Sequence, residues 1–250
     1  MKCGARADIR IFPDTAAMSR GAAASILSLA HASVASGGRF AFALSGGSTP
    51  RQLYSLLAAA PWREAMPWPQ VHLFWADERC VPPDHRDSNY GMAHDTFLAQ
   101  VPLPDGNVHR IRAEAGPDRA AEAYEEELEA FFGPALPSFD LVLLGSGEDG
   151  HTASLFPGSM HVRERKRLAL AVSLARPGPD RVTLTLPVLN NARQVLFLVA
   201  GKKKAGVVHE IVEDGNPKRY PAGLVEPVQG CLTWMLDRQA AQLLTAAWRV

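Results

Sequence analysis

The sequence predicts an α/β protein with a mostly parallel, Rossmann-like open sheet and helices on both faces. Two observations lead to this fold class. Short apolar runs typical of buried strands alternate along the whole chain with longer helical patterns, and this alternation is the signature of a parallel sheet. Glycine-rich turns follow several of these runs, at the carboxyl ends of strands where open α/β sheets bind their ligands.

The first part of the chain contains three expected strands, at residues 8–12, 39–44 and 71–76. Asp14 is suited to cap an Ala-rich helix that ends at Gly37-Gly38. A second helix is expected to begin at Pro50, because proline is tolerated at a first helical position, and to run to about Ala60.

The middle of the chain contains two expected helices and a strong strand. One helix begins at Ser88 or Asn89 and extends to about residue 100, and the other covers 118–132. The aliphatic run 139–144 is too short for a solvated helix and is expected to be a buried strand.

The last part of the chain continues the same alternation. We expect further strands at 168–174, 182–186, 195–200 and 231–236. A helix is expected over 202–212, and Asp237 is suited to cap a final helix.

Composition and charge limit the classes of function. The 250 residues contain 26 Lys and Arg and 26 Asp and Glu, so no overall field favours nucleic acid or a membrane surface. We find no linker or repeat and expect one domain over 1–250. The monomer is favoured, although the sequence leaves the oligomeric state open.

The expected location is cytoplasmic. Charged residues begin the chain without the apolar core of a secretory signal, and no apolar run approaches the length of a membrane helix. Three widely scattered cysteines, with no C-x-x-C spacing, favour a reducing compartment.

The most informative stretch is Gly145-Ser-Gly-Glu-Asp149-Gly-His151, which directly follows the strand at 139–144. Its glycines free the backbone for a tight turn. An acid two residues before a histidine, at the carboxyl end of a strand, favours proton-transfer chemistry near neutral pH. The alternative is a glycine-rich loop in which both side chains are merely solvated.

A second turn, Ser45-Gly46-Gly47-Ser48-Thr49, joins a strand to a helix. Backbone N–H groups freed by the glycines and the positive end of a helix dipole can bind an anion. The turn matches neither a P-loop nor G-x-G-x-x-G, so it does not indicate a nucleotide. An ordinary tight turn is the alternative.

Three further segments carry charge at strand ends. Asp77-Glu78-Arg79 follows the strand at 71–76, and Arg181 precedes that at 182–186. Lys204 lies in the first turn of a helix, where a cation opposes the helix dipole unless an anion is bound. Surface salt bridges and exposed lysines are the alternatives.

Metal sites and serine-hydrolase triads are poorly supported. The histidines show no H-x-x-x-H spacing and no cysteine partners, so we expect no metal and no other cofactor. Neither Ser45 nor Ser154 lies in a G-x-S-x-G elbow. Cys80 has no neighbouring base and is expected to be packed rather than nucleophilic.

Several motifs occur in order and together closely resemble the 6-phosphogluconolactonase family. They are Ala43-Leu-Ser-Gly-Gly-Ser-Thr-Pro50, Trp75-Ala-Asp-Glu-Arg79, Ser88-Asn-Tyr-Gly91, Gly145-x-Gly-x-Asp-Gly-His-Thr-Ala-Ser-Leu-Phe-Pro157, Arg181-Val-Thr-Leu-Thr-Leu-Pro187 and Gly201-x-x-Lys204-Ala205. The resemblance covers about residues 12–241, nearly the whole chain.

The resemblance implies hydrolysis of 6-phospho-D-glucono-1,5-lactone to 6-phospho-D-gluconate, in the oxidative pentose phosphate pathway and without a metal. His151 would be the general base, and Asp149 would either orient it or contact the sugar. Backbone N–H groups of the glycine-rich turns would stabilise the oxyanion. The phosphate would be held by Arg79, by Lys204 and by the turn Ser45, Gly46, Gly47, Ser48 and Thr49. Asp77 and Asn89 would contact sugar hydroxyls. Arg181 would be a further anion contact.

Two alternatives remain. A glucosamine-6-phosphate isomerase or deaminase has a similar turn, but usually an acid five residues after the histidine, where this chain has Phe156. A non-catalytic sugar-phosphate sensor on the same scaffold would carry a DNA-binding segment, and this sequence contains no basic patch that indicates one.

Overall fold

A seven-stranded parallel sheet forms the centre of the computed structural model, which describes residues 7–173, 178–213, 219–245 and 248. The strand order is β1-β10-β9-β6-β2-β3-β5, and every pairing between neighbours is parallel. The Rossmann-like sheet predicted from the sequence is therefore confirmed. Its strands are β1 (Asp8–Phe12), β2 (Phe40–Leu44), β3 (Val71–Trp75), β5 (Val108–His109), β6 (Leu141–Leu144), β9 (Gln194–Val199) and β10 (Cys231–Asp237).

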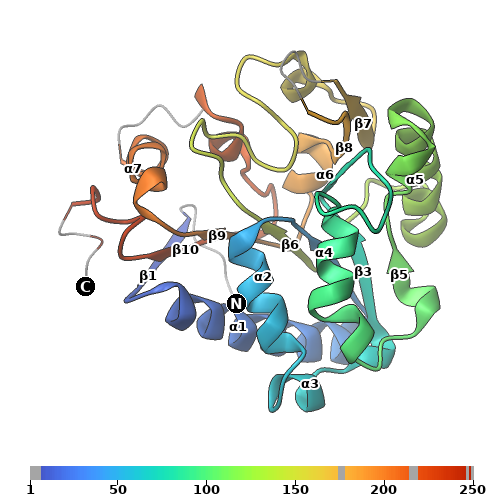
Figure 1. Ribbon diagram of the computed structural model, residues 1–250, viewed down its shortest axis with the longest axis horizontal. Coiled ribbons are helices and arrows are strands. Elements are labelled where there is room, and N and C mark those ends of the chain that lie inside the picture. The colour runs from blue at the N-terminus through green and yellow to red at the C-terminus, as the bar shows by residue number, and fades with distance from the viewer. Residues whose placement is uncertain (1–6, 174–177, 214–218, 246–247, 249–250) are drawn as a thin grey trace.

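Helices cover both faces of this sheet. In Figure 1, α1, α2 and α4 lie together on one face, and α5, α6 and α7 lie on the other. The α-helices are α1 (Thr15–Gly37), α2 (Ser48–Leu57), α3 (Trp62–Ala65), α4 (Asn89–Thr96), α5 (Pro117–Phe132), α6 (Leu186–Asn190) and α7 (Ala205–Val212). As predicted, Asp14 caps α1 by accepting a hydrogen bond from Ala17 N at 2.7 Å, and Gly38 ends the helix in the left-handed conformation.

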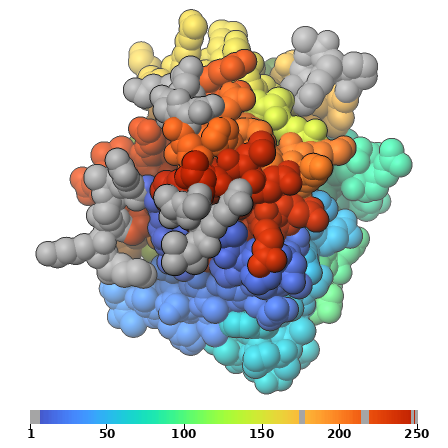
Figure 2. Space-filling model, turned by 90° about the vertical axis from the view of Figure 1, so that its left-hand side faces the viewer, coloured from blue at the N-terminus to red at the C-terminus, as the bar shows by residue number. Residues whose placement is uncertain are grey.

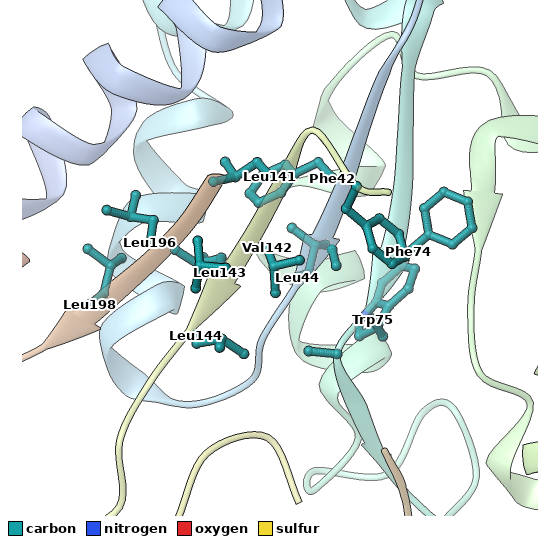
Figure 3. Packing of buried hydrophobic residues seen from close by; sticks show 14 of the residues in the cluster. Phe42, Leu44, Phe74, Trp75, Leu141, Val142, Leu143, Leu144, Leu196 and Leu198 are labelled. Carbon is teal, nitrogen blue, oxygen red and sulfur yellow. The ribbon is translucent and has the colours of Figure 1, made fainter. Parts of the chain in front are cut away.

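The core lies between the sheet and its two helical layers. All four residues of β6 are buried, and their neighbours in β2, β3 and β9 pack beside them (Figure 3). A parallel sheet covered on both faces requires such continuous apolar strands. Each fully buried side chain of this kind contributes about 1.5–3 kcal/mol to folding. This core fixes the position of the turns that follow the strands.

The neighbouring strands β2 and β6 form the switch point of the sheet. From β2 the chain proceeds to β3 and β5 at one edge, whereas from β6 it proceeds to β9 and β10 toward the other edge. Connections that diverge in this way leave a crevice at the carboxyl ends of the two strands, and ligands of open α/β sheets bind there. The two turns singled out in the sequence follow these two strands.

A second, antiparallel sheet was not predicted. It consists of β4 (Asp77–Arg79), β8 (Arg181–Leu184) and β7 (Ala169–Val172), in that order. We expected the strands at 168–174 and 182–186 to join the main sheet. Instead they pair with the chain just after β3 and with each other, which brings Arg181 opposite Arg79. Residue 174, at the end of one expected strand, lies outside the described residues.

The predicted helix after Asp237 is wrong. Residues 238–243 form turns, although the Asp237 carboxylate accepts a hydrogen bond from Ala240 N at 2.8 Å, as a helix cap would, and another from Gly201 N at 3.0 Å. Leu244 is buried, and Figure 2 shows this segment, in red, spread over the surface between the blue and orange elements.

One smaller expectation also needs correction. Helix α2 begins at Ser48, two residues before Pro50. Cys231 is disulfide-bonded whereas Cys80 is a free thiol. The expected reducing compartment stays a prediction.

Candidate active site

An open cavity of about 230 Å³ lies at the carboxyl ends of the central strands. It is bounded by the turns after β2 and β6, by the chain after β3, and by the start of the segment after β9. Almost all residues singled out in the sequence line it: Ser45, Gly46, Gly47, Ser48, Thr49, Asp77, Arg79, Asn89, His151, Arg181 and Lys204. Asp149 lies just behind the lining, in contact with His151.

The turn at 145–151, hereafter the histidine turn, holds an acid–imidazole pair. Asp149 Oδ1 lies 2.5 Å from His151 Nδ1 and also accepts a hydrogen bond from His151 N at 3.2 Å. Burial raises the pKa of Asp149, but the hydrogen bonds and charge of His151 lower it by more, so that pKa lies below its ordinary value. A carboxylate partner at Nδ1 places the proton there, which leaves the Nε2 lone pair of a neutral imidazole able to accept a proton.

The backbone of the histidine turn is shaped around this pair. Gly147 N donates to His151 O at 2.8 Å, and Thr152 Oγ1 donates to Gly145 O at 2.8 Å. A Cβ at Gly147 would lie 2.1 Å from His151 Nδ1 and 2.4 Å from Asp149 Oδ1. Glycine is therefore required at 147, because any side chain would occupy the space of the imidazole.

The turn at 45–49, hereafter the glycine turn, leads into helix α2 and is built differently. Gly47 has φ 108°, and no side chain among the described residues caps the helix. The Ser45 hydroxyl donates to Leu143 O at 2.7 Å, so this side chain ties β2 to β6. The positive end of α2 thus faces the cavity without a protein anion on it, as an anion site requires.

A buried carboxylate joins three walls of the cavity. Asp77 accepts hydrogen bonds from Ser154 Oγ at 2.7 Å and from Asn89 Nδ2 at 3.3 Å, and Arg181 Nη1 lies 3.9 Å from it. The sequence does not predict this role for Ser154, which its motifs exclude only as a hydrolase nucleophile. Its position three residues after His151 was the available signal that it faces the same site.

Glu78 fixes the start of helix α4 and thereby Asn89. Its buried carboxylate accepts hydrogen bonds from Asn89 N and Tyr90 N, each at 2.7 Å, and from Ser88 Oγ at 3.1 Å. Burial raises the pKa of Glu78 more than these hydrogen bonds lower it. Asn89 in turn lies against the glycine turn, because a Cβ at Gly46 would be 1.7 Å from Asn89 Oδ1.

Three cations line the cavity. Arg79 Nη1 donates to Asp87 O at 2.7 Å, whereas its Nε is buried without a hydrogen-bond partner among the described residues. Lys204 ends a short 3₁₀ turn (Lys202–Lys204) that leads directly into α7, as predicted for a lysine in a first helical turn. Arg181 completes the group from β8. Arginine and lysine around an uncapped helix start are suited to bind a phosphate.

Two further side chains bear on the alternatives raised by the sequence. The ring centroids of Phe156 and His151 lie 4.8 Å apart. An apolar side chain therefore lies beside the imidazole at the position where glucosamine-6-phosphate deaminases usually have an acid. Burial raises the pKa of the Cys80 thiol to about 11, which makes it a poor nucleophile at neutral pH.

Similarity to known proteins covers nearly the whole chain. Residues 13–234 match the family model of glucosamine-6-phosphate isomerases/6-phosphogluconolactonase. A 6-phosphogluconolactonase of Synechocystis is 45% identical over 84% of this chain and 87% of its own length. The human 6-phosphogluconolactonase is 44% identical over 83% and 81%.

Solved structures agree in fold. A 6-phosphogluconolactonase from Trypanosoma cruzi superposes with a TM-score of 0.86 at 32% identity, over 98% of this chain and 99% of its own. A monomeric glucosamine-6-phosphate deaminase has a TM-score of 0.80 at 20% identity, over 94% and 99%, and this likeness concerns the fold alone. No helix among the described residues is long and apolar enough to cross a membrane.

Proposed function

Since this chain belongs to the family of glucosamine-6-phosphate isomerases and 6-phosphogluconolactonases, we propose that it hydrolyses 6-phospho-D-glucono-1,5-lactone to 6-phospho-D-gluconate. This reaction belongs to the oxidative pentose phosphate pathway. The relatives named 6-phosphogluconolactonase support it. The observation that carries the proposal is the Asp149–His151 pair at a cavity also lined by Arg79, Arg181 and Lys204.

The histidine turn supplies the chemistry in this proposal. His151 Nε2 removes a proton from water as the water oxygen bonds to C1 of the lactone, and the carbonyl becomes an oxyanion. When the tetrahedral intermediate collapses, the C1–O5 bond breaks and the imidazolium returns the proton to O5. Asp149 keeps Nδ1 protonated and stabilises the imidazolium. N–H groups of the glycine-rich turns stabilise the oxyanion.

The glycine turn and the cations bind the phosphate of the substrate. The start of α2, Arg79 and Lys204 surround the same cavity, and charge-assisted hydrogen bonds from such groups are stronger than neutral ones. Arg181 is a further contact. Asn89 and Asp77 stay candidates for the sugar hydroxyls, although the hydrogen bonds at Asp77 also suit it to hold the cavity walls together.

The two alternatives lack a specific observation in their favour. A deaminase would need an acid in place of Phe156, and a sensor would not need a histidine held by a carboxylate. A turnover assay distinguishes all three. The lactone is generated from glucose 6-phosphate, and its loss is followed by NMR above the spontaneous rate, while ammonia is measured with glucosamine 6-phosphate. Faster lactone loss supports the proposal, ammonia release indicates the deaminase, and binding without turnover indicates the sensor.

Several other expectations stay predictions. A single domain over 1–250 is supported by one continuous cluster of buried side chains. A monomer, a cytoplasmic location, and the lack of a nucleic-acid partner, membrane partner or cofactor await measurement. Sedimentation of the purified protein would test the monomer, and activity after treatment with chelators would test for a metal cofactor.

A further inference from the structure

Tyr220 lies directly against the histidine turn, although it is about seventy residues away in the sequence and outside every motif. Gly150, the residue between Asp149 and His151, has φ 77°, and a Cβ there would lie 2.3 Å from Tyr220 Cδ1. The backbone makes a second contact, because Ala222 N donates to Gly150 O at 3.0 Å. The peptide between the acid and the imidazole is thus held by a ring and by a hydrogen bond.

The other end of Tyr220 is anchored on helix α7. Its hydroxyl donates a short hydrogen bond to Glu210 Oε2, and Arg219 Nη1 lies 3.6 Å from the same oxygen. Helix α7 starts immediately after Lys204. Tyr220 therefore links the helix that follows the phosphate-binding lysine to the turn that carries the histidine.

We propose that Tyr220 is a positioning residue for His151. Its ring, anchored on α7 through Glu210, holds Gly150 in place and so keeps the imidazole in its hydrogen bond with Asp149. Tyr220 is absent from the lining of the cavity and is not expected to touch the substrate. Gly150 N donates to Gly147 O at 3.1 Å within the turn, and the Tyr220 ring adds an outside contact that further restricts a glycine with a positive φ. The inference rests on the proposed lactonase function for its kinetic readout.

The first test compares Tyr220→Ala with Tyr220→Phe, which keeps the ring on Gly150 but removes the hydroxyl. We expect Tyr220→Ala to lower kcat about ten- to a hundredfold, the cost of a misplaced catalytic group, with little change in KM. Tyr220→Phe should recover most of this loss. Arg219→Ala, which removes an exposed outer contact, is the matched control and should stay close to the wild type.

The unphosphorylated lactone, used as a second substrate, distinguishes an effect of Tyr220 through His151 from an effect through Lys204. If Tyr220 acts through His151, Tyr220→Ala should lower kcat by the same factor for the lactone with and without its phosphate. If the loss occurs only with the phosphorylated lactone and mainly in KM, Tyr220 acts through Lys204 and the proposal is overturned. An unchanged kcat for Tyr220→Ala also overturns it.

A spectroscopic measurement tests the inference without substrate. In ¹⁵N-histidine-labelled protein, the His151 Nδ1 proton should give a downfield resonance, assigned by its loss in His151→Ala. It should weaken or exchange rapidly in Tyr220→Ala and persist in Tyr220→Phe. Persistence in both variants contradicts the proposal even if the protein proves to have another activity. If Tyr220→Ala does not fold, Tyr220→Leu provides the same comparison.

Discussion

The histidine turn and the glycine turn follow neighbouring strands, yet they are built in opposite ways. The histidine turn is held by bonds of its own backbone, by Thr152 and by the Asp149–His151 pair. The glycine turn leads into α2, whose start has no side-chain cap within the part of the chain that the structure describes. A fixed side chain suits a proton transfer that needs exact geometry, whereas free backbone dipoles suit an ion that can bind in several orientations. We therefore expect changes in the first turn to affect kcat and changes around the second to affect KM.

The largest expected effect comes from His151→Ala. Loss of the proposed general base should lower kcat roughly 10²–10⁴-fold, with little change in KM because the proposed phosphate contacts lie elsewhere. Steady-state kinetics corrected for spontaneous lactone opening would measure it. His94→Ala is a matched control, because His94 also lies beside an acid, at 3.3 Å from Asp95, but outside the cavity. A wild-type rate in His151→Ala would place the base elsewhere and remove the contrast between the turns.

A backbone change tests whether the histidine turn must keep its shape. Gly147→Ala places a methyl group where His151 lies and should lower kcat about a hundredfold, the order of cost of a misplaced group. Gly145→Ala in the same turn meets no atom closer than 3.9 Å and should cost far less. Comparable kcat values for the two variants would show that the turn adapts, contrary to the rigid role assigned to it.

Substitution of a residue proposed to bind the phosphate should change KM. Lys204→Ala removes a charge-assisted contact worth roughly 1.5–3 kcal/mol, so KM should rise about ten- to a hundredfold with kcat nearly unchanged. Lys202→Ala, an exposed lysine of the same 3₁₀ turn, is the control. With the unphosphorylated lactone, Lys204→Ala should have the same kcat/KM as the wild type. Equal kcat/KM of the wild type for both lactones would refute phosphate binding here.

The smallest effect concerns stability. The folded pKa of Asp149 lies below its ordinary value of 3.8, so its contribution to folding is present above that value and is lost as the pH falls through the folded pKa. Asp149→Asn should therefore be less stable than the wild type at neutral pH, and urea midpoints should converge as the pH falls below about 5 and through the folded pKa. A difference that is independent of pH would mean that the carboxylate charge does not stabilise the histidine turn.

The sequence predicted six of the seven strands of the main sheet, all but β5, and most of the cavity, because both depend on local signals. Continuous apolar runs such as Leu141–Leu144 are specific for buried parallel strands, and turns after such strands must meet at one edge of the sheet. His151, Arg79 and Lys204 were found in this way. The roles of these residues in binding and catalysis stay predictions until they are substituted.

Long-range contacts were beyond the sequence. Asp77–Arg79 is short and polar, so its pairing with β8 depends on where the main sheet places it. The hydrogen bond from Ser154 to Asp77 and the contact of Tyr220 with Gly150 join residues far apart in the chain and have no periodic signature. The helix expected after Asp237 is replaced by turns, although Asp237 accepts a hydrogen bond from Ala240 N as a helix cap would.

The position of the crevice between β2 and β6 also bears on how the site comes into existence. The glycine turn belongs to the first half of the chain and the histidine turn to the second, and the halves meet where β2 pairs with β6 and, at the sheet's edge, where β1 pairs with β10. Neither half contains a working site. Catalysis would thus arise only when the halves dock in register, and two separately expressed fragments that recovered activity on mixing would report directly on that assembly.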